Sequence, residues 1–266
     1  MSPWLSVIFP VLNNRIGFVR AIDQVLSLRR SDIEIVVIDG GSTDGTLEEI
    51  RVRESRISYW ETGKDKGIAD AFNRGVVHSS GTFIAILNSD DFWDVNALAA
   101  IEEGVRENSE GGVFYGAVRY VDNESGYAYI RRPRLSALKY RMWLFHPAMV
   151  VSRSAYERVG LYDECYTHAM DSEWCHRAMA SGLSFVELDA VLANMSLGGV
   201  SDRQFIKSLS QYRRSVIAHG LCGPFEAWIF FVWFASLKLT MRSAVLRPFK
   251  VLRDKILNRG IVGHSK

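Results

Sequence analysis

Apolar runs alternate with amphipathic stretches along the first hundred residues of this 266-residue chain. Ser6–Leu12, Ile33–Ile38 and Phe83–Leu87 are short and rich in apolar residues, and a polar turn follows each of them. Such runs are typical of strands buried on both faces of a sheet. Between the first two runs, apolar residues recur at helical spacing: Phe18, Ile22, Val25 and Leu26. Strands joined through single helices predict an α/β fold with a doubly wound, mostly parallel sheet.

Beyond residue 94 the apolar runs are shorter, which predicts a mixed sheet in the second half of the same domain. Helical spacing predicts helices at Thr46–Arg53, Ile68–Val77, Val95–Glu107 and Met170–Ala180. Further short strands are expected at residues 57–60, 113–116, 119–121, 127–130 and 148–151. We interpret residues 1–220 as one α/β domain and residues 221–266 as a C-terminal helical segment.

Composition narrows the class of protein. The formal net charge of +2 gives no case for a nucleic-acid partner. Three cysteines, an odd number without C-x-x-C spacing, favour a reducing compartment. The first residues lack a basic region followed by an apolar stretch, so we expect no secretory signal and a cytoplasmic location.

Two adjacent carboxylates, Asp90 and Asp91, come just beyond the buried run at residues 83–87. The carboxyl end of such a strand is where open α/β sheets bind ligands. Two like charges repel unless a cation or donor groups offset them, and hard oxygen ligands suit Mg²⁺ or Mn²⁺. Asp and Asn are also ordinary turn residues, so the pair alone leaves a plain turn open.

Two more polar segments are expected at the same edge of the sheet. Asp39 directly follows the second strand, where its carboxylate can accept hydrogen bonds from a base or ribose. Asp44, in the same turn, is better interpreted as a helix cap. In the charged loop before the helix at residue 68, Lys66 can meet a phosphate or a base carbonyl. Asp70, taken alone, is an ordinary first-turn acid.

These segments together resemble glycosyltransferase family 2, which comprises inverting, nucleotide-sugar-dependent enzymes with a GT-A fold. The resemblance spans residues 4–200 and is nearest to bacterial polysaccharide and glycolipid transferases. It rests on motifs in the family's order and spacing: Pro10 and Asn13, Ile38–Thr46, Asp65–Ile68, Asn73–Gly75, Leu87–Asp91, His146–Pro147, Gly160–Glu164, Met170–Trp174 and Arg177.

The resemblance implies a donor site at the ends of the first strands. It gives Asp39 the recognition of the nucleotide base, and the residues that share this donor site are Pro10, Val11, Asn13, Lys66, Asp70, Asn88, Ser89 and Asp90. Asp90 and Asp91 match the carboxylates that contact ribose and the metal-bound diphosphate, with Mg²⁺ or Mn²⁺ as the metal. Asn88 stands where the family usually has Asp, so which carboxylate binds the metal directly is left open.

The resemblance also implies a general base, Asp171. The acceptor hydroxyl must lose a proton as it attacks the anomeric carbon, and a positioned carboxylate can take it. On the residues alone, Asp171 could equally be a first-turn helix acid. Glu173 is expected to pair with Arg177 at i,i+4 spacing. His146 is a candidate contact to sugar or diphosphate, although a lone His is more often structural.

Leu197–Ser201 resembles the loop that closes over the donor in this family, although it could also be a plain connector. Arg203 is a weaker candidate for reaching the diphosphate, and a helix is expected to start near Asp202.

The C-terminal segment carries an apolar and aromatic run, Ala227–Ala235, followed by a basic stretch from Arg242 onward. A membrane-spanning helix needs about 20 predominantly apolar residues, and this run is shorter. Its tryptophans and basic flank favour an interfacial helix, so we expect residues 225–259 to attach to a membrane surface. A helix buried against the domain and a true span are the alternatives.

The sequence therefore predicts an inverting glycosyltransferase at the cytoplasmic face of the inner membrane. Its expected substrates are a nucleoside diphosphate sugar, UDP-linked, and a hydroxyl acceptor on a glycan or lipid-linked saccharide. A nucleotidyltransferase is less well supported, because Val11–Arg15 is not a glycine-rich, basic loop. A non-catalytic sugar-nucleotide-binding or scaffold protein is the alternative from another class.

Overall fold

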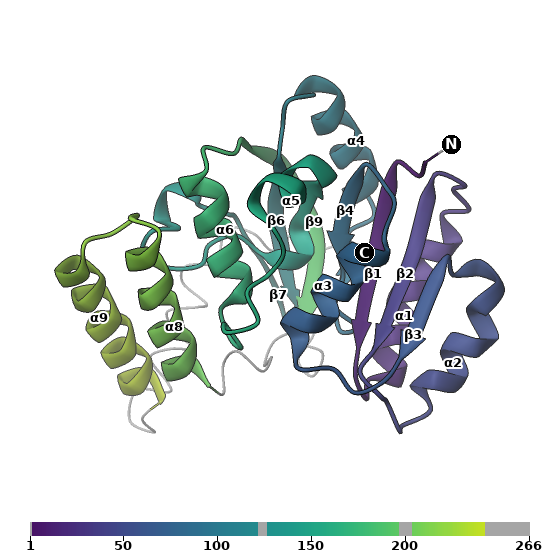
Figure 1. Cartoon of the computed structure of the whole chain (residues 1–266), viewed down its shortest axis with the longest axis horizontal. Coiled ribbons are helices and arrows are strands. Elements are labelled where there is room, and N and C mark those ends of the chain that lie inside the picture. Colours follow the sequence, from purple (N-terminus) through teal and green to yellow (C-terminus); the bar gives the residue numbers. More distant parts are fainter. Residues whose placement is uncertain (1, 122–126, 197–203, 243–266) are drawn as a thin grey trace.

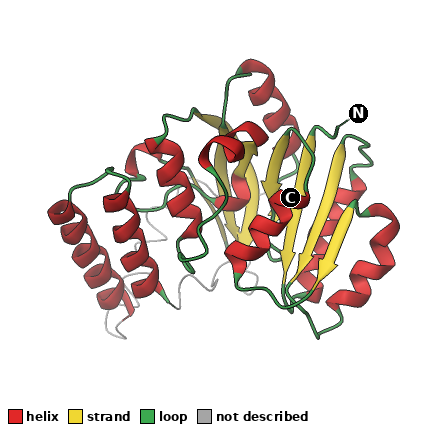
Figure 2. Ribbon diagram, in the orientation of Figure 1, coloured by secondary structure: helices red, strands yellow, loops and turns green. Residues whose placement is uncertain are grey.

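A central nine-stranded sheet with helices on both faces organises the chain (Figures 1 and 2). The structure is a computed structural model that describes residues 2–121, 127–196 and 204–242. The strands are β1 (Leu5–Val11), β2 (Ile33–Asp39), β3 (Tyr59–Thr62), β4 (Phe83–Ile86), β5 (Phe92–Trp93), β6 (Val113–Val121), β7 (Ala128–Arg131), β8 (Met149–Ser152) and β9 (Phe185–Ser196). The helices are α1 (Arg15–Ser27), α2 (Thr46–Arg53), α3 (Ile68–His78), α4 (Ala97–Glu107), α5 (Arg153–Val159), α6 (Met170–Ala180), α8 (Phe205–Ala218) and α9 (Pro224–Arg242).

The first four strands are parallel and lie in the order β3-β2-β1-β4. The chain moves outward from β1 to β3 and then crosses back over the sheet to β4. This reversal makes the gap between β1 and β4 a topological switch point, where doubly wound sheets bind ligands at their carboxyl edge. The predicted doubly wound arrangement is confirmed for this half of the sheet.

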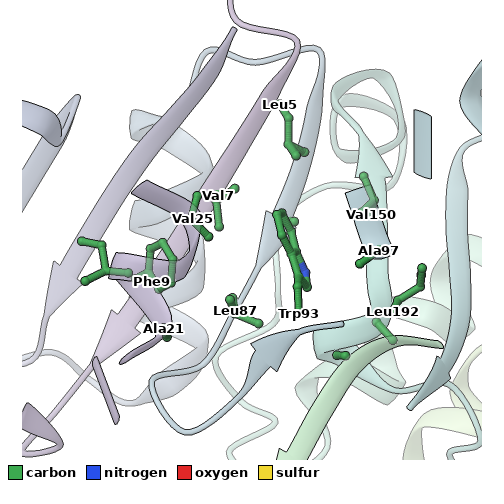
Figure 3. Close-up of a cluster of buried hydrophobic side chains, with 14 of the residues drawn as sticks. Leu5, Val7, Phe9, Ala21, Val25, Leu87, Trp93, Ala97, Val150 and Leu192 are labelled. Atoms are coloured by element: carbon green, nitrogen blue, oxygen red, sulfur yellow. The ribbon is translucent and has the colours of Figure 1, made fainter. Parts of the chain in front are cut away.

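Alternating residues of β1 feed two cores on opposite faces of the sheet. Val7 and Phe9 pack with α1 in one cluster, which also takes in Trp93 and is drawn in Figure 3. Ile8 packs with α3 in the other cluster. A Cβ on Gly75 of α3 would lie only 2.3 Å from Ile8 Cγ2, so α3 approaches β1 as closely as it does because residue 75 is glycine.

The second half continues the sheet with mixed pairing, as predicted. β8 is antiparallel to both β4 and β6, whereas β9 is parallel to β6. The stretches at residues 113–116 and 119–121 were predicted as separate strands, but they form the single strand β6. β9 is not expected from the sequence, because Glu187 and Asp189 interrupt its apolar pattern. Its pairing with β6 also shifts register.

α8 and α9 pack against each other beside the sheet domain (Figure 1). Their shared apolar cluster is Tyr212, Val216, Cys222 and Ala227. Within the described residues, no helix is both long enough and apolar enough to cross a bilayer. Residues 197–203, which include the predicted loop, Asp202 and Arg203, lie outside the described part of the chain, as does the basic stretch beyond residue 242.

Candidate active site

The predicted site residues gather at one edge of the sheet, the lower edge in the view of Figure 1. β1, β2 and β4 end there because they are parallel. β8 starts at this edge because it runs antiparallel to β4, which brings His146 to the same place. α6 leads by a short turn into β9, which runs in the direction of β4, so the N-terminus of α6 with Asp171 also faces this edge.

The turns after β1 and β2 are joined by hydrogen bonds. Asn13, whose φ of 49° lies in the left-handed region, donates its backbone N–H to Ser42 Oγ at 2.8 Å. Its side-chain oxygen accepts the N–H of Thr43 at 2.8 Å. Pro10 and Val11, the last residues of β1, are buried beside Ile38 and Asp39. The two turns therefore form one preorganised surface at the end of the sheet.

Asp39 is fully buried, and its carboxylate holds its own turn together. It accepts the N–H groups of Gly41 and Ser42 at 3.2 and 3.1 Å, and the hydroxyl of Thr62 on β3. These bonds give Asp39 a structural role that sequence reasoning did not assign. Its recognition of a nucleotide base remains a prediction.

The turn after β4 separates its two carboxylates. Asp90 is exposed, whereas Asp91 is 4% exposed, and its carboxylate accepts one hydrogen bond among the described residues, from Asn88 Nδ2 at 3.2 Å. Burial, together with the charge of Asp90, raises the pKa of Asp91 to about 7. Ser89 is also buried and accepts a hydrogen bond from Asn14 Nδ2 at 3.0 Å, which ties this turn to the start of α1.

The oxygen atoms of this turn fit a divalent cation. Asn88 Oδ1 is buried without a hydrogen-bond partner in the described structure, and it lies in the same turn as the poorly compensated Asp91. Among the described residues, no group of three or more His, Cys, Asp and Glu side chains forms a complete metal site. Mg²⁺ is commonly held by one or two carboxylates and completed by substrate phosphates, which matches this set.

Lys66, in the loop before α3, has an exposed side chain, whereas Asp70, in the first turn of α3, is bonded to that loop. The Lys66 side chain is 78% exposed, with its Nζ 3.8 Å from Glu164 Oε2. Asp70 accepts the N–H of Lys66 at 3.1 Å and lies 3.9 Å from Arg74. Asp70 therefore orders the start of α3, as a first-turn acid does, while the Lys66 ammonium group, beside Glu164, is exposed to solvent.

His146 is held as a neutral side chain. Its ring stacks on Phe72 at 4.8 Å, and Nε2 lies 3.0 Å from the hydroxyl of Tyr162. Nδ1 is buried with no partner in the described residues. Burial lowers the pKa of His146 to about 4. A neutral imidazole with one uncommitted nitrogen can form a hydrogen bond to a ligand, but it does not bring a charge.

Asp171 lies in the first turn of α6. One of its oxygens, Oδ1, accepts the N–H of Ser172 at 2.7 Å, and Oδ2 accepts no hydrogen bond from described residues. Burial raises the pKa of Asp171, which makes the carboxylate a stronger proton acceptor. Burial raises the pKa of Tyr162, and the charge of Asp171 adds to this shift, so Asp171 lies in the same neighbourhood as the Tyr162–His146 pair.

α6 is anchored by side chains that sequence reasoning missed. The predicted pair of Glu173 with Arg177 is present at 2.7 Å, and buried Glu173 also contacts His219 Nε2 at 3.0 Å. On α8, Gln211 accepts the N–H of His168 at 2.8 Å and donates to the hydroxyl of Thr167 at 3.1 Å. The i,i+4 spacing indicated the first pair, but no sequence signal links α8 to the segment before Asp171.

The parallel half-sheet, its switch point and the acidic turn after β4 are those of an α/β protein with a GT-A fold. The chain belongs to glycosyl transferase family 2, whose family model matches residues 6–164. It is therefore a glycosyltransferase.

Its curated relatives include glycosyltransferases of mycobacteria. A PGL/p-HBAD biosynthesis glycosyltransferase of Mycobacterium bovis is 27% identical over 80% of this chain and 86% of that protein. An uncharacterized glycosyltransferase of Mycobacterium tuberculosis is 29% identical over 76% of this chain and 79% of that protein.

Solved structures share the fold at lower identity. Staphylococcus aureus TarS 1–349 in complex with UDP-GlcNAc superposes with a TM-score of 0.62 at 16% identity, over 80% of this chain and 66% of that one. The chain spans 39% of a longer TarS structure. The mannosyltransferase PcManGT of Pyrobaculum calidifontis, in complex with GDP-Man and Mn²⁺, superposes with a TM-score of 0.59 at 17% identity, over 96% of this chain and 81% of that one.

Proposed function

We propose that this glycosyltransferase moves a sugar, with inversion, from a nucleoside diphosphate sugar to a hydroxyl acceptor. The observation that carries the proposal is the shared edge: the acidic turn at residues 88–91 and the half-buried Asp171 face the same end of the sheet. The acidic turn is suited to bind a diphosphate with its cation, and Asp171 is suited to accept the proton of the acceptor hydroxyl.

The donor binds with its diphosphate at the turn after β4. The exposed side chain of Asp90 is the better candidate for a direct metal ligand, while buried Asp91 supports the turn through Asn88. When bound, Mg²⁺ or Mn²⁺ offsets charge on the departing nucleoside diphosphate. Asp39 and the residues around Pro10, Val11 and Asn13 receive the base. A uridine donor is consistent with the UDP-GlcNAc complex of TarS.

Transfer requires one proton to move. The acceptor oxygen attacks the anomeric carbon from the face opposite the leaving group, and Asp171 takes the hydroxyl proton as this bond forms. The bond between the anomeric carbon and the diphosphate oxygen breaks, and its electron pair leaves with the nucleoside diphosphate. Because one displacement occurs, the configuration at the anomeric carbon inverts.

The acceptor is a saccharide or lipid-linked saccharide of cell-surface glycolipid or polysaccharide synthesis. The name of the M. bovis relative, a PGL/p-HBAD biosynthesis glycosyltransferase, supports a glycolipid. A lipid-linked acceptor is consistent with peripheral attachment at the cytoplasmic face of the inner membrane through residues 225–259.

The test is donor turnover by the purified protein with a panel of nucleotide sugars and Mn²⁺. Asp171→Asn is expected to lower turnover by roughly 10²-fold or more and to leave donor affinity nearly unchanged, because a base acts in the transition state. Asp189→Asn, which alters an exposed acid on β9, serves as the control.

Two outcomes would contradict the assignment. An equal loss of nucleotide affinity in Asp171→Asn would place this residue in the donor site or in the fold. A wild-type protein that binds donors but neither hydrolyses nor transfers them would favour a non-catalytic scaffold protein.

A further inference from the structure

α9 presents two different faces. One face packs on α8 and the segment at residues 139–141 through Ala227, Phe230 and Phe234. The other face exposes large apolar side chains: Phe225, Trp228, Ile229, Val232, Trp233, Leu237 and Leu239, each between 37% and 78% exposed. At about 100° per residue, these positions cover roughly half of the helix circumference. Among the described residues, an apolar face this large on one helix has no counterpart elsewhere.

A basic segment without acids packs beside α9. Residues 131–141 contain Arg131, Arg132, Arg134, Lys139 and Arg141. The guanidinium groups of Arg131, Arg134 and Arg141 lie 4.2, 5.3 and 5.8 Å from the ring centre of Trp143. Within the described structure, Arg131 and Arg134 form no ion pair with an acid, whereas Arg132 pairs with Asp189.

Ring contacts join the basic segment to α9 and to the active-site edge. Tyr140 packs on Phe230 at 4.0 Å, and Arg141 lies 5.5 Å from the ring of Phe234. Phe230 is three residues from exposed Trp233 and seven from Leu237, so it adjoins the exposed face. At the other end, Arg131 lies 5.5 Å from the ring of Phe145, which directly precedes His146.

We propose that the exposed face of α9 and the arginines of residues 131–141 form one docking surface for an anionic phospholipid bilayer. The proposal rests on the peripheral location proposed above, and it adds a folded basic segment that carries part of the contact. Apolar and tryptophan side chains enter the headgroup boundary, and the arginines meet lipid phosphates. The active-site edge is then held near the membrane, where a lipid-linked acceptor is presented.

The charge favours a bilayer over a second copy of the chain. A symmetric dimer through α9 would bring two copies of the same basic segment together, and like charges oppose such contact. The sequence beyond residue 242 adds further Lys and Arg residues against the single acid Asp254, which reinforces attraction to an anionic surface.

The experiment is vesicle flotation of the full-length protein with phosphatidylcholine alone and with phosphatidylcholine mixed with phosphatidylglycerol. The wild type is expected to float with the anionic vesicles, less so at high salt. Arg131→Gln/Arg134→Gln is expected to weaken binding by roughly 10-fold or more, since each basic residue near an anionic surface contributes about fivefold. Trp228→Ser/Trp233→Ser is expected to weaken binding to a similar degree.

Matched controls alter equivalent side chains elsewhere on the surface. Val52→Ser/Val77→Ser changes two exposed apolar residues of α2 and α3, and Arg51→Gln/Arg106→Gln changes two exposed arginines of α2 and α4. Both are expected to float like the wild type. Donor hydrolysis, measured in every variant, is expected to stay unchanged, so loss of docking is distinguished from failure of the proposed catalysis.

Three results would overturn the proposal. The wild type could fail to float with anionic vesicles. Both double variants could float as well as the controls do. Analytical ultracentrifugation could show a wild-type dimer that the tryptophan variant converts to a monomer while flotation is unaffected, which would assign the face to a second copy.

Discussion

Two aspartates at strand ends, Asp39 and Asp91, have opposite local environments. Asp39 receives three hydrogen bonds from its own turn and from β3, which compensate for its burial. The carboxylate of Asp91 accepts one hydrogen bond, from the side-chain amide of Asn88, and the exposed carboxylate of Asp90 is next to it in the sequence. A buried carboxylate with so little compensation favours either a proton or a cation, so we expect a metal ion to affect this turn more than the turn at Asp39.

Asp90→Ala and Asp91→Ala are both expected to weaken donor binding that depends on Mn²⁺. We expect Asp90→Ala to abolish the metal dependence, because its exposed carboxylate is the direct ligand in our proposal. Titration calorimetry of UDP with and without Mn²⁺ measures this. Unchanged affinity in both variants, with and without the metal, would refute the metal site.

His146 makes stability depend on pH. Its pKa is lowered to about 4 by burial, so the native state binds fewer protons than the unfolded chain between pH 4 and 6.5. The stabilising contribution of a neutral His146 is therefore complete above pH 6.5 and is lost as the pH falls toward 4. Denaturant titrations at a series of pH values give the free energy of unfolding as a function of pH. In His146→Gln, this free energy should change less steeply with pH over this window, by at most about 1.4 kcal/mol per pH unit. If the pH dependence is the same as in the wild type, His146 titrates normally.

At the scale of elements, α8 contributes to the position of α6, together with the bonds that Trp174 and Arg177 of α6 donate to the backbone at residues 159–161. Gln211 contacts both Thr167 and His168, just before the helix that carries Asp171, and His219 contacts Glu173 within that helix. The hairpin of α8 and α9 is thereby connected to the segment that holds the proposed base.

Gln211→Ala is expected to lower turnover while donor affinity stays near the wild-type value. The loss of two hydrogen bonds is expected to reduce the free energy of unfolding by about 1–2 kcal/mol. Ser210→Ala, an exposed neighbour on α8, is the control, and steady-state kinetics with calorimetry separate the two effects. Equal turnover in both variants would show that α8 does not position Asp171.

At the scale of the whole molecule, the sheet collects residues from distant parts of the chain. One edge of the sheet brings together Asp39, the turn at residues 88–91, His146 and Asp171. β2 and β4 end there because they are parallel, β8 starts there because it is antiparallel to β4, and α6 begins there because it leads into β9, which runs in the direction of β4. The donor that we propose would contact several elements at once, so we expect it to stabilise the entire domain against unfolding.

Donor nucleotides are therefore expected to raise the melting temperature, and to raise it further with Mn²⁺. Ligand at a hundredfold excess over its dissociation constant adds about 2.7 kcal/mol to stability. A thermal-shift screen with UDP- and GDP-sugars checks this and ranks the donors. If no nucleotide shifts the melting temperature with or without Mn²⁺, the proposed donor site is wrong.

Local patterns determined the elements and their order. β-branched runs and helical spacing predicted β1, β2 and α3 to within a residue at each end, α6 at its observed bounds and the existence of α1, because such periodicity reflects neighbours along the chain. The same patterns predicted that Asp39 and residues 88–91 follow strands, and that Glu173 pairs with Arg177.

Long-range packing decided the rest. Four features depend on contacts between residues far apart in sequence. They are the place of β9 in the sheet, the burial of Asp91 beside an exposed Asp90, the hydrogen bonds from α8 to the segment before Asp171, and the two faces of α9. No short window of sequence contains both partners of such a contact. Sequence therefore determined which residues end each strand, while only the tertiary structure decided which of them are buried, which lie together at one edge of the sheet and which surface is left uncovered.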